Sequence, residues 1–339
     1  MAQKKTQMEN QPAMKVGIIG IGQVGLVLMT NIHKANNTQF ILSAVCDTRP
    51  EIGQLVPQGV TFTREAAEVV KSCDVIMTCL PRAQDVKTVW ERSIKDNLSK
   101  GQYWIDHTSS IHSQNEQLDR EVTCLGAQFI EAPITGGLSA LKRGEMCCLV
   151  AGKRTAVDRM RSLLDINYQQ LHYLGQQVGS CTVVKLWSNL LNASQIVAMT
   201  EMLLVAKRQG LDLNKVFHAI RASSGNSFAW ETGVPEVFKG RYDTSFTIQN
   251  HNKDIANGVQ LADDLGVDIP MMKLTQQKFK DAQSAFGDLA GCYSYAKLAE
   301  DLHEEKLQVA GYEKWSWGIE VIGEEQTSAI RHENCVLPE

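Results

Sequence analysis

The chain has 339 residues, enough for two domains, and its formal net charge at pH 7 is −4. Its composition, 43% hydrophobic and 21% charged residues, is that of a globular protein. Because there is no basic excess to neutralise phosphates, nucleic acid is not expected as the main partner. No uninterrupted apolar stretch reaches membrane-spanning length, so no membrane partner is expected either.

The cysteines and the N-terminus indicate a compartment. The cysteines number nine, no two have CxxC spacing, and most lie in apolar stretches. This pattern favours reduced, buried thiols over disulfides or a metal site. Residues 1–13 are polar without an apolar core, which predicts a disordered leader rather than a secretory signal. Together these features predict a cytoplasmic protein with no resident metal.

Strands and helices are expected to alternate in the first half of the chain. Short apolar runs predict strands, at 15–19, 40–46, 74–80, 103–105, 129–132 and 146–150. Amphipathic segments between them predict helices, at 24–34, 63–71, 85–94, 113–125 and 157–165. Such alternation is typical of a mainly parallel sheet covered on both faces, so residues 14–178 are predicted to form an α/β domain.

From Gly179 onward the pattern is helical. Helices are expected at 182–209, 213–222, 255–265, 271–286 and 293–302. Residues 179–302 are therefore predicted to form an all-α domain for substrate binding and dimerisation. Residues 303–339 are a charged C-terminal extension with Trp315 and Trp317, and they either pack on a neighbouring subunit or extend into solvent.

A glycine-rich turn follows the first predicted strand and opens a helix, the context that gives GxGxxG spacing its meaning. Gly20 permits the tight turn, Gly22 leaves room for a pyrophosphate, and Gly25 lets the helix pack close to the strand. The alternative is an ordinary strand–helix turn. The predicted cofactor-binding residues of this turn are Gly20, Ile21, Gly22, Gln23, Val24 and Gly25.

Asp47 ends the second predicted strand, about 20 residues beyond the turn. A carboxylate there accepts hydrogen bonds from the adenosine ribose and repels a 2′-phosphate, which favours NAD over NADP. Arg49 stands two residues on and could reverse this preference. NAD is the predicted cofactor, and NADP stays open.

Lys185 lies near the start of the apolar helix that opens the second domain, and Asn189 lies one turn further on the same face. If burial disfavours the charged form of the lysine, its amine can exchange a proton with an alcohol oxygen near neutral pH. The alternative is a side chain that packs its stem on the core and keeps its amine in water.

A second glycine-containing segment, at 134–137, follows the strand predicted at 129–132. Its two glycines leave backbone N–H groups free to form an anion-binding concavity, and the hydroxyl of Thr135 adds a donor. This predicts a site for a carboxylate, or for a sulfonate or phosphonate of similar size. The alternative is a turn at a strand end.

Six segments, taken in order, resemble the β-hydroxyacid dehydrogenase family, which includes 3-hydroxyisobutyrate dehydrogenase, tartronate semialdehyde reductase and 6-phosphogluconate dehydrogenase. They are GIGQVG at 20–25, CLP at 79–81, DHTSS at 106–110, EAPITGGLSALKRGE at 131–145, GSCTVVKLWSN at 179–189 and FTIQNHNKDIANG at 246–258. The resemblance runs from about Val16 to Leu302 and implies a Rossmann domain followed by an all-α domain.

The resemblance also implies roles for residues outside the glycine turn. Lys185 matches the catalytic lysine of the family. Substrate contacts are implied for Thr108, Thr135, Gly136, Gly137 and Asn189, and cofactor contacts for Leu80, Pro81, Ser109 and Lys253. His107 stands where members often carry serine, and it either lines the pocket or caps a strand end.

The implied function is hydride transfer between NAD(P) and a small β-hydroxy acid or its semialdehyde, by a homodimer or homotetramer, with Lys185 as general acid and base. One alternative is an NADPH-dependent enzyme like the imine reductases, which share the architecture but usually carry another residue at the position of Lys185. The other is a dinucleotide-binding scaffold without catalysis. Such relatives have lost the lysine and gained basic domains, whereas this chain has the lysine and no basic extension.

Overall fold

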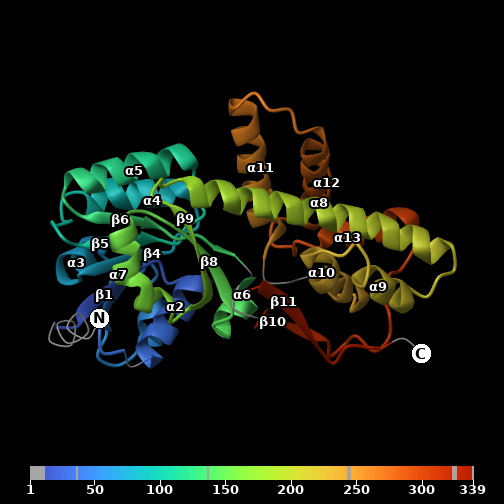
Figure 1. Ribbon diagram of the computed structural model, residues 1–339, viewed down its shortest axis with the longest axis horizontal. Helices are drawn as coiled ribbons and strands as arrows, with labels where there is room; N and C mark the ends of the chain where they lie inside the picture. The colour runs from blue at the N-terminus through green and yellow to red at the C-terminus, as the bar shows by residue number, and fades with distance from the viewer. Residues whose placement is uncertain (1–11, 36, 136, 243–245, 323–326, 338–339) are drawn as a thin grey trace. The chain divides into compact units, whose positions relative to one another are not determined.

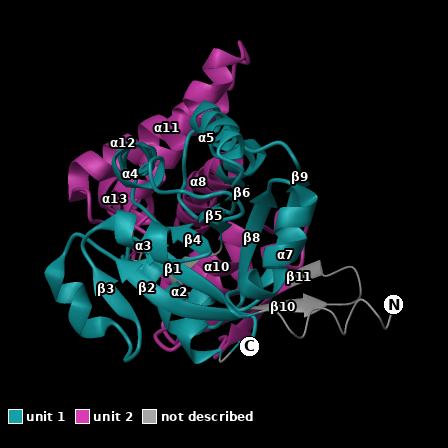
Figure 2. Cartoon of the chain, turned by 90° about the vertical axis from the view of Figure 1, so that its left-hand side faces the viewer, with its two compact units in different colours: residues 1–185 teal, residues 186–339 magenta. Residues whose placement is uncertain are grey.

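The computed structural model describes residues 12–35, 37–135, 137–242, 246–322 and 327–337. The chain divides into two compact units, residues 1–185 and 186–339 (Figure 2). The division falls inside helix α8 (Ser180–Arg208), whereas the sequence pattern places the boundary just before that helix. Each unit is described by itself below.

The first unit is built around a nine-stranded sheet with the order β3-β2-β1-β4-β5-β6-β8-β7, in which β9 also pairs with β8. Strands β1 to β6 pair in parallel, and β8 runs antiparallel to β6 and β7. The predicted mainly parallel sheet is confirmed. The strands are β1 (Met14–Ile19), β2 (Phe40–Cys46), β3 (Thr61–Thr63), β4 (Val75–Thr78), β5 (Tyr103–Asp106), β6 (Gln128–Glu131), β7 (Ile134–Thr135), β8 (Met146–Ala151) and β9 (Tyr168–Gly175).

Helices cover both faces of this sheet, with α3, α4 and α5 on one face and α2 and α7 on the other (Figure 1). On the first face, the buried rings of Trp104 and Phe129 stand on the sheet against Trp90. The helical segments are α2 (Gln23–Lys34), η1 (Pro50–Leu55), α3 (Ala66–Ser72), α4 (Ala83–Val89), the π-helical η2 (Trp90–Ile94), α5 (His112–Cys124), α6 (Gly137–Lys142) and α7 (Arg154–Leu164).

Several elements of this unit were not predicted from the sequence, namely β3, β7, β9, η1 and α6. The helix expected at 63–71 begins only at Ala66, because Thr61–Thr63 extends the sheet beside β2. Strand β9 was not predicted, since its sequence YQQLHYLG carries few of the branched apolar residues that mark a strand. It joins the sheet by pairing in parallel with β8.

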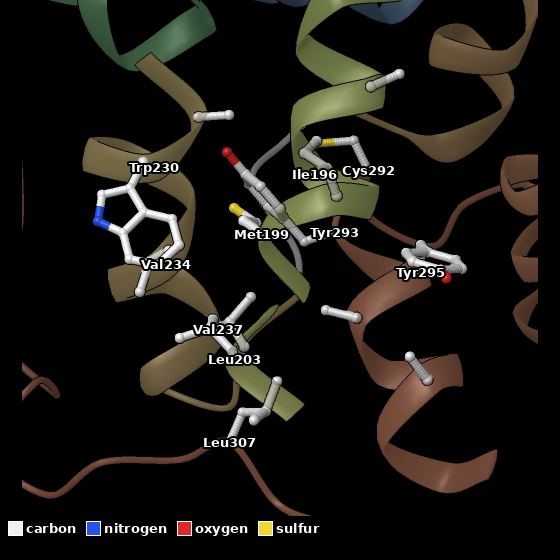
Figure 3. Packing of buried hydrophobic residues seen from close by; sticks show 14 of the residues in the cluster. Ile196, Met199, Leu203, Trp230, Val234, Val237, Cys292, Tyr293, Tyr295 and Leu307 are labelled. Atoms are coloured by element: carbon white, nitrogen blue, oxygen red, sulfur yellow. The ribbon is translucent and has the colours of Figure 1, made fainter. Parts of the chain in front are cut away.

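The second unit contains the remaining helices: α9 (Leu213–Arg221), α10 (Phe228–Phe238), α11 (Ile248–Asp264), α12 (Pro270–Phe286), α13 (Ser294–His303) and most of α8. The predicted helical character of this region is confirmed. Helix α10 was missed because Gly233 and Pro235 are helix breakers by propensity. It forms because its apolar side chains, including Trp230, Val234 and Val237, are buried among the residues of α8 shown in Figure 3.

The C-terminal extension packs on its own chain. Tyr312 and Trp315 are buried in the core of the second unit. Leu307, five residues before Tyr312, is buried in the same core (Figure 3). Strands β10 (Ser316–Ile322) and β11 (Thr327–Glu333) then form an antiparallel hairpin. For these buried side chains both sequence-based alternatives, packing on a neighbouring subunit and extension into solvent, are therefore wrong.

One helix of the described residues, α8, is long and apolar enough by length and composition to cross a membrane. Of its most apolar window, 56% is buried inside the protein. The core helix of a soluble protein has the same length and burial, so α8 is weak support for a membrane span.

Candidate functional site

The glycine-rich turn lies at the carboxyl end of β1, where the strand order of the sheet changes direction between β2 and β4. In open α/β sheets this edge is where ligands bind. Gly20 has a φ of +94°, and a Cβ there would lie 2.4 Å from the carbonyl oxygen of Cys79. At Gly25 a Cβ would lie 2.0 Å from the carbonyl oxygen of Gly20. The fold therefore requires glycine at both positions.

Gly22 differs from these two glycines, because a Cβ there would meet nothing within 4 Å. It is the N-cap of α2 and, as glycine, gives the helix no side-chain cap. The first turn of α2, which includes Gln23 and Val24, thus receives no side-chain hydrogen bond from its N-cap residue. Open space beside an uncapped helix N-terminus fits the diphosphate of a dinucleotide, as the sequence predicts.

Asp47 is hydrogen-bonded to the glycine turn and to Arg49. Its carboxylate accepts from the backbone N–H of Ile21 at 2.9 Å and from Nε of Arg49 at 2.9 Å. Nη2 of Arg49 donates to the carbonyl oxygen of Ile21 at 3.0 Å. Burial acts to raise the pKa of Asp47, but the bonds from Arg49 and Ile21 outweigh it, and this pKa lies below its ordinary value. Asp47 is ionised, and Arg49 is held against the turn.

The loops that follow β4 and β5 meet at this edge of the sheet. The backbone N–H of Leu80 donates to Oγ1 of Thr108 at 3.1 Å. A Cβ on Gly20 would lie 2.9 Å from a side-chain carbon of Leu80, so this loop borders the glycine turn. Thr108 is buried, Ser109 and Leu80 are half-buried, and Pro81 is exposed. Four predicted site residues are thus grouped beside the turn: Leu80, Pro81, Thr108 and Ser109.

Asp106, at the end of β5, holds these loops in place. Its Oδ1 accepts from Oγ1 of Thr78 at 2.7 Å and from the backbone N–H of Thr108 at 3.1 Å. Burial raises the pKa of Asp106 to about 6. The sequence places Asp106 in the DHTSS segment but gives it no role. Its structural role depends on a hydrogen bond from Thr78, 28 residues away in the chain, which the sequence alone does not show.

His107, the residue after β5, is buried. Its Nδ1 lies 2.8 Å from the carbonyl oxygen of Ala132 and 3.2 Å from the hydroxyl oxygen of Tyr168. Burial lowers the pKa of His107 to about 4, so the ring is neutral at neutral pH. Of the two sequence-based alternatives, the strand-end role agrees with this geometry.

Strands β7 and β8 bring Thr135 and Lys185 into one neighbourhood. Thr135 pairs with Cys147 across the antiparallel β7–β8 ladder. Cys147 in turn is close enough to Lys185 for the ammonium to act on its thiol, although burial dominates and raises the pKa of Cys147 to about 11. Lys185 is half-buried. Lys185 of α8 and Thr135 of β7 thus both lie near Cys147 of β8, and their roles in a site stay predictions.

Two predicted residues of this segment are only partly described. Gly136 lies outside the described residues, and Gly137 begins α6 without a described side-chain environment. Their predicted contacts with a substrate stay predictions. The cations that follow them are exposed, and Arg143 is paired with Glu145 at 2.8 Å.

In the second unit, Asn189 and Lys253 share one acceptor. Nδ2 of Asn189 donates to Oδ2 of Asp254 at 2.7 Å, and Nζ of Lys253 lies 3.6 Å from Oδ1 of the same carboxylate. Nε2 of His251 lies 3.0 Å from the carbonyl oxygen of Asn189. Asp254 and Asn189 are buried. The carboxylate of Asp254 therefore orients two residues that the sequence places in the site.

Sequence reasoning missed one further residue, Glu131, at the end of β6. It is fully buried, and its carboxylate accepts backbone N–H groups from the first turn of α8. The available signal was a charged residue that closes an apolar strand, which is costly unless the charge is paired.

Two family models match the chain in succession. Residues 15–175 match the NAD binding domain of 6-phosphogluconate dehydrogenase, and residues 179–298 match the NAD-binding model of NADP-dependent 3-hydroxyisobutyrate dehydrogenase. Among curated proteins, the mitochondrial 3-hydroxyisobutyrate dehydrogenase of Drosophila melanogaster is 24% identical over 304 residues, which cover 88% of this chain and 92% of the relative.

Solved structures show the same fold. A 3-hydroxyisobutyrate dehydrogenase of Mycobacterium tuberculosis, in a structure with L-serine, has a TM-score of 0.77 and 19% identity, covering 84% of this chain and 99% of that one. An imine reductase from Pseudomonas sp. is more distant, with a TM-score of 0.56 and 16% identity, covering 84% of this chain and 99% of that one.

Proposed function

The chain belongs to the β-hydroxyacid dehydrogenase family, and we propose that Lys185 is the general acid and base of its reaction. That reaction is hydride transfer between NAD(P) and a small β-hydroxy acid or its semialdehyde. The observation that carries the assignment of Lys185 is its surroundings. Lys185 is half-buried, its charge acts to lower the pKa of Cys147, and Cys147 pairs with Thr135 in the β7–β8 ladder.

Removal of hydride from an alcohol carbon requires a base for the hydroxyl proton. When bound, the nicotinamide of the cofactor accepts the hydride, and the chain must supply the base. In oxidation, neutral Lys185 takes the hydroxyl proton at Nζ. In reduction, its ammonium returns a proton to the forming alkoxide oxygen.

The acid group of the substrate is assigned to the segment that begins at Thr135. Its hydroxyl and the backbone N–H groups of the two glycines after it are hydrogen-bond donors for a carboxylate or sulfonate. Asn189 is assigned to the substrate oxygen, because its amide is oriented by Asp254. Lys253 is assigned to the cofactor. The residues of the turn at 20–25, with Leu80, Pro81 and Ser109, hold the dinucleotide.

A substrate panel tests this function. NAD or NADP reduction is followed spectrophotometrically with 3-hydroxyisobutyrate, 3-hydroxypropionate, glycerate and a hydroxysulfonate. Turnover of at least one acid is expected. Imine turnover without alcohol oxidation would instead support the imine reductase alternative, against which Lys185 itself argues. Cofactor binding without turnover of either substrate class would support a non-catalytic scaffold.

NAD is proposed as the preferred cofactor, because Asp47 is ionised where the adenosine ribose binds in this fold. Arg49 is bonded to Asp47 and to the backbone of the turn, which reduces its freedom to bind a 2′-phosphate. We predict that Asp47→Ala weakens NAD binding about tenfold and narrows the gap between NAD and NADP. Dissociation constants from cofactor fluorescence measure both effects, with Asp74→Ala as the control at the other end of the strands. An unchanged preference would show that another group sets it.

A homodimer is proposed, with α8 at its interface. The side chains of Leu191, Met202 and Val205 recur along one face of α8 and are 50–56% exposed. An apolar stripe of this length on a soluble protein marks an interaction surface, and the same stripe can serve both subunits in a twofold dimer. Met202→Glu is predicted to give a monomer in light scattering, whereas Ile41→Glu, a similarly exposed apolar site on β2, leaves the mass unchanged. A dimer that persists in Met202→Glu would contradict this interface.

A cytoplasmic location is proposed from the cysteines. All nine lie among the described residues, and they form no disulfide there. Burial raises the pKa values of several thiols, among them Cys46 and Cys79, so these remain protonated and unreactive. A reducing compartment suits such a chain. Fractionation of cells that express the full chain tests the location.

A further inference from the structure

We propose that Glu131 is a positioning residue, which fixes Lys185 relative to Thr135 by capping the first turn of α8 from the end of β6. This proposal rests on the catalytic role proposed above for Lys185. Glu131 is fully buried, lies four residues before Thr135 in the chain, and touches α8 directly. One short segment therefore holds the start of the helix at one end and carries Thr135, which is assigned above to the acid group of the substrate, at the other.

The carboxylate of Glu131 binds α8 through both oxygens. Oε2 accepts from the backbone N–H groups of Gly179 at 2.6 Å and Cys181 at 3.3 Å. Oε1 accepts from the backbone N–H of Thr182 at 2.7 Å and from its hydroxyl at 2.6 Å. The first N–H groups of a helix have no partner inside the helix, so these bonds fix where α8 begins. Hydrogen bonds to a charged acceptor are the stronger kind, which makes this cap firm.

Two further contacts support the cap. Nδ2 of Asn115 donates to Oε1 of Glu131 and to Oγ1 of Thr182, both at 3.1 Å. Gly179 has a φ of +101°, and a Cβ there would lie 2.4 Å from Nδ1 of His112. The chain thus enters α8 through a turn that only glycine fits, with its N–H aimed at Glu131.

The same turn of α8 rests on the strand beside Thr135. Cys181 forms a small buried cluster with Leu149 and Ala151 of β8, and Cys147 of the same strand packs against this cluster. Cys147 is the ladder partner of Thr135. A shift of the helix start would therefore move Lys185 relative to β8 and Thr135, and so relative to a substrate that Thr135 binds.

The cap also has an electrostatic consequence. The N-terminus of a helix carries a partial positive charge, which disfavours a nearby ammonium, and the carboxylate of Glu131 offsets that charge. Lys185 follows Thr182 by three residues, about 4.5 Å along the helix axis. Replacing the carboxylate by a neutral amide leaves the positive helix end uncompensated, so the neutral amine is favoured down to lower pH.

The test is Glu131→Gln in the full-length protein. Its amide NH₂ must face one set of N–H donors, so the cap fails on one side. We expect kcat to fall about 10–100-fold, because a displacement of roughly 1 Å at the reacting centre has effects of that size. The dissociation constant of NAD stays within about twofold. The pH midpoint of kcat/KM for oxidation shifts down by about half a unit to one unit, as a lost charge nearby predicts. Glu131→Asp, which keeps the charge, retains the wild-type midpoint.

Glu300→Gln is the matched control. Glu300 is also fully buried, and it accepts a backbone N–H from Leu307 at 2.8 Å, in the second unit. The Glu300→Gln variant should lower the melting temperature as Glu131→Gln does, but leave kcat and the pH midpoint of kcat/KM unchanged. If Glu131→Gln does not fold, Thr182→Val removes one donor to the cap and should shift the same quantities less. Wild-type kcat and midpoint in the folded cap variants would overturn the proposal.

A readout independent of turnover separates this proposal from the proposed function. The pH dependence of acetylation of Lys185 by acetic anhydride, followed by mass spectrometry, reports the midpoint of the amine directly. Failure of the wild-type protein to oxidise any hydroxy acid would refute the function alone. An acetylation midpoint that is the same in wild type and Glu131→Gln would refute the cap's effect on Lys185, whatever the substrate.

Discussion

Replacing Lys185 by alanine is expected to reduce kcat for hydroxy-acid oxidation by about 10²–10⁴-fold, the usual size of a general acid–base contribution. The hydroxyl proton then has no positioned acceptor, and only water remains. The cofactor contacts assigned to the turn at 20–25 do not involve this amine, so the dissociation constant of NAD should change by less than about twofold. Steady-state rates and cofactor fluorescence measure the two quantities separately.

The control for this substitution lies on the same helix. Lys207 is exposed near the C-terminal end of α8, and Lys207→Ala should leave both rate and affinity at wild-type values. A Lys185→Ala variant with the wild-type rate would rule out this residue as the base. A variant that loses NAD affinity in proportion to its rate would place the amine at the cofactor rather than at the substrate.

The second large effect is expected at Gly22. A Cβ at this position meets nothing within 4 Å in the protein itself, and the backbone there has negative φ. The melting temperature of Gly22→Ala should therefore stay near that of wild type. If the open space is where the diphosphate binds, the added methyl group occupies it, and NAD should bind roughly 100-fold more weakly, which corresponds to about 2.7 kcal/mol.

Two other glycines make this test specific. Gly25→Ala should lose both stability and affinity, because its Cβ would collide with the backbone of Gly20. Gly225→Ala, whose Cβ would make only ordinary contact with Ile220, should lose neither. Calorimetry of the three variants, with and without NAD, measures both quantities. Unchanged NAD affinity in Gly22→Ala would show that the diphosphate lies elsewhere.

Local sequence patterns predict the first unit well, because a doubly wound sheet is built from short repeated strand–helix steps. The turn at 20–25 is recognisable because three glycines are each required there for a different steric reason. Strand β9 is not recognisable from its sequence, since its sequence is polar and its pairing with β8 is what stabilises it as a strand. Helix α10 is similar: burial of Trp230, Val234 and Val237 outweighs the propensities of Gly233 and Pro235.

The residues of the candidate site also fall into two groups, those that local sequence can nominate and those that depend on tertiary contacts. Lys185, Thr135 and the glycine turn can be proposed as site residues from their own residue types and spacing. The buried carboxylates that orient predicted site residues could not be proposed in this way, because Asp106, Glu131 and Asp254 act through partners 28, 51 and 65 residues away in the chain. A buried carboxylate has a role only once its donors are known, and those donors come from the tertiary fold. The C-terminal extension was unplaceable for the same reason, because Tyr312 and Trp315 fill a core made by distant helices.

The central claim is that the amine of Lys185 exchanges the proton of the substrate hydroxyl. Chemical rescue tests it most directly: NADH formation by Lys185→Ala is measured with the best acid of the substrate panel while small primary alkylamines are added over a range of pH. The account predicts a rate that rises with the concentration of unprotonated amine, whereas the Asn189→Ala variant shows no such rise. A Lys185→Ala enzyme that already turns over at the wild-type rate, and that is indifferent to added amine, would contradict it.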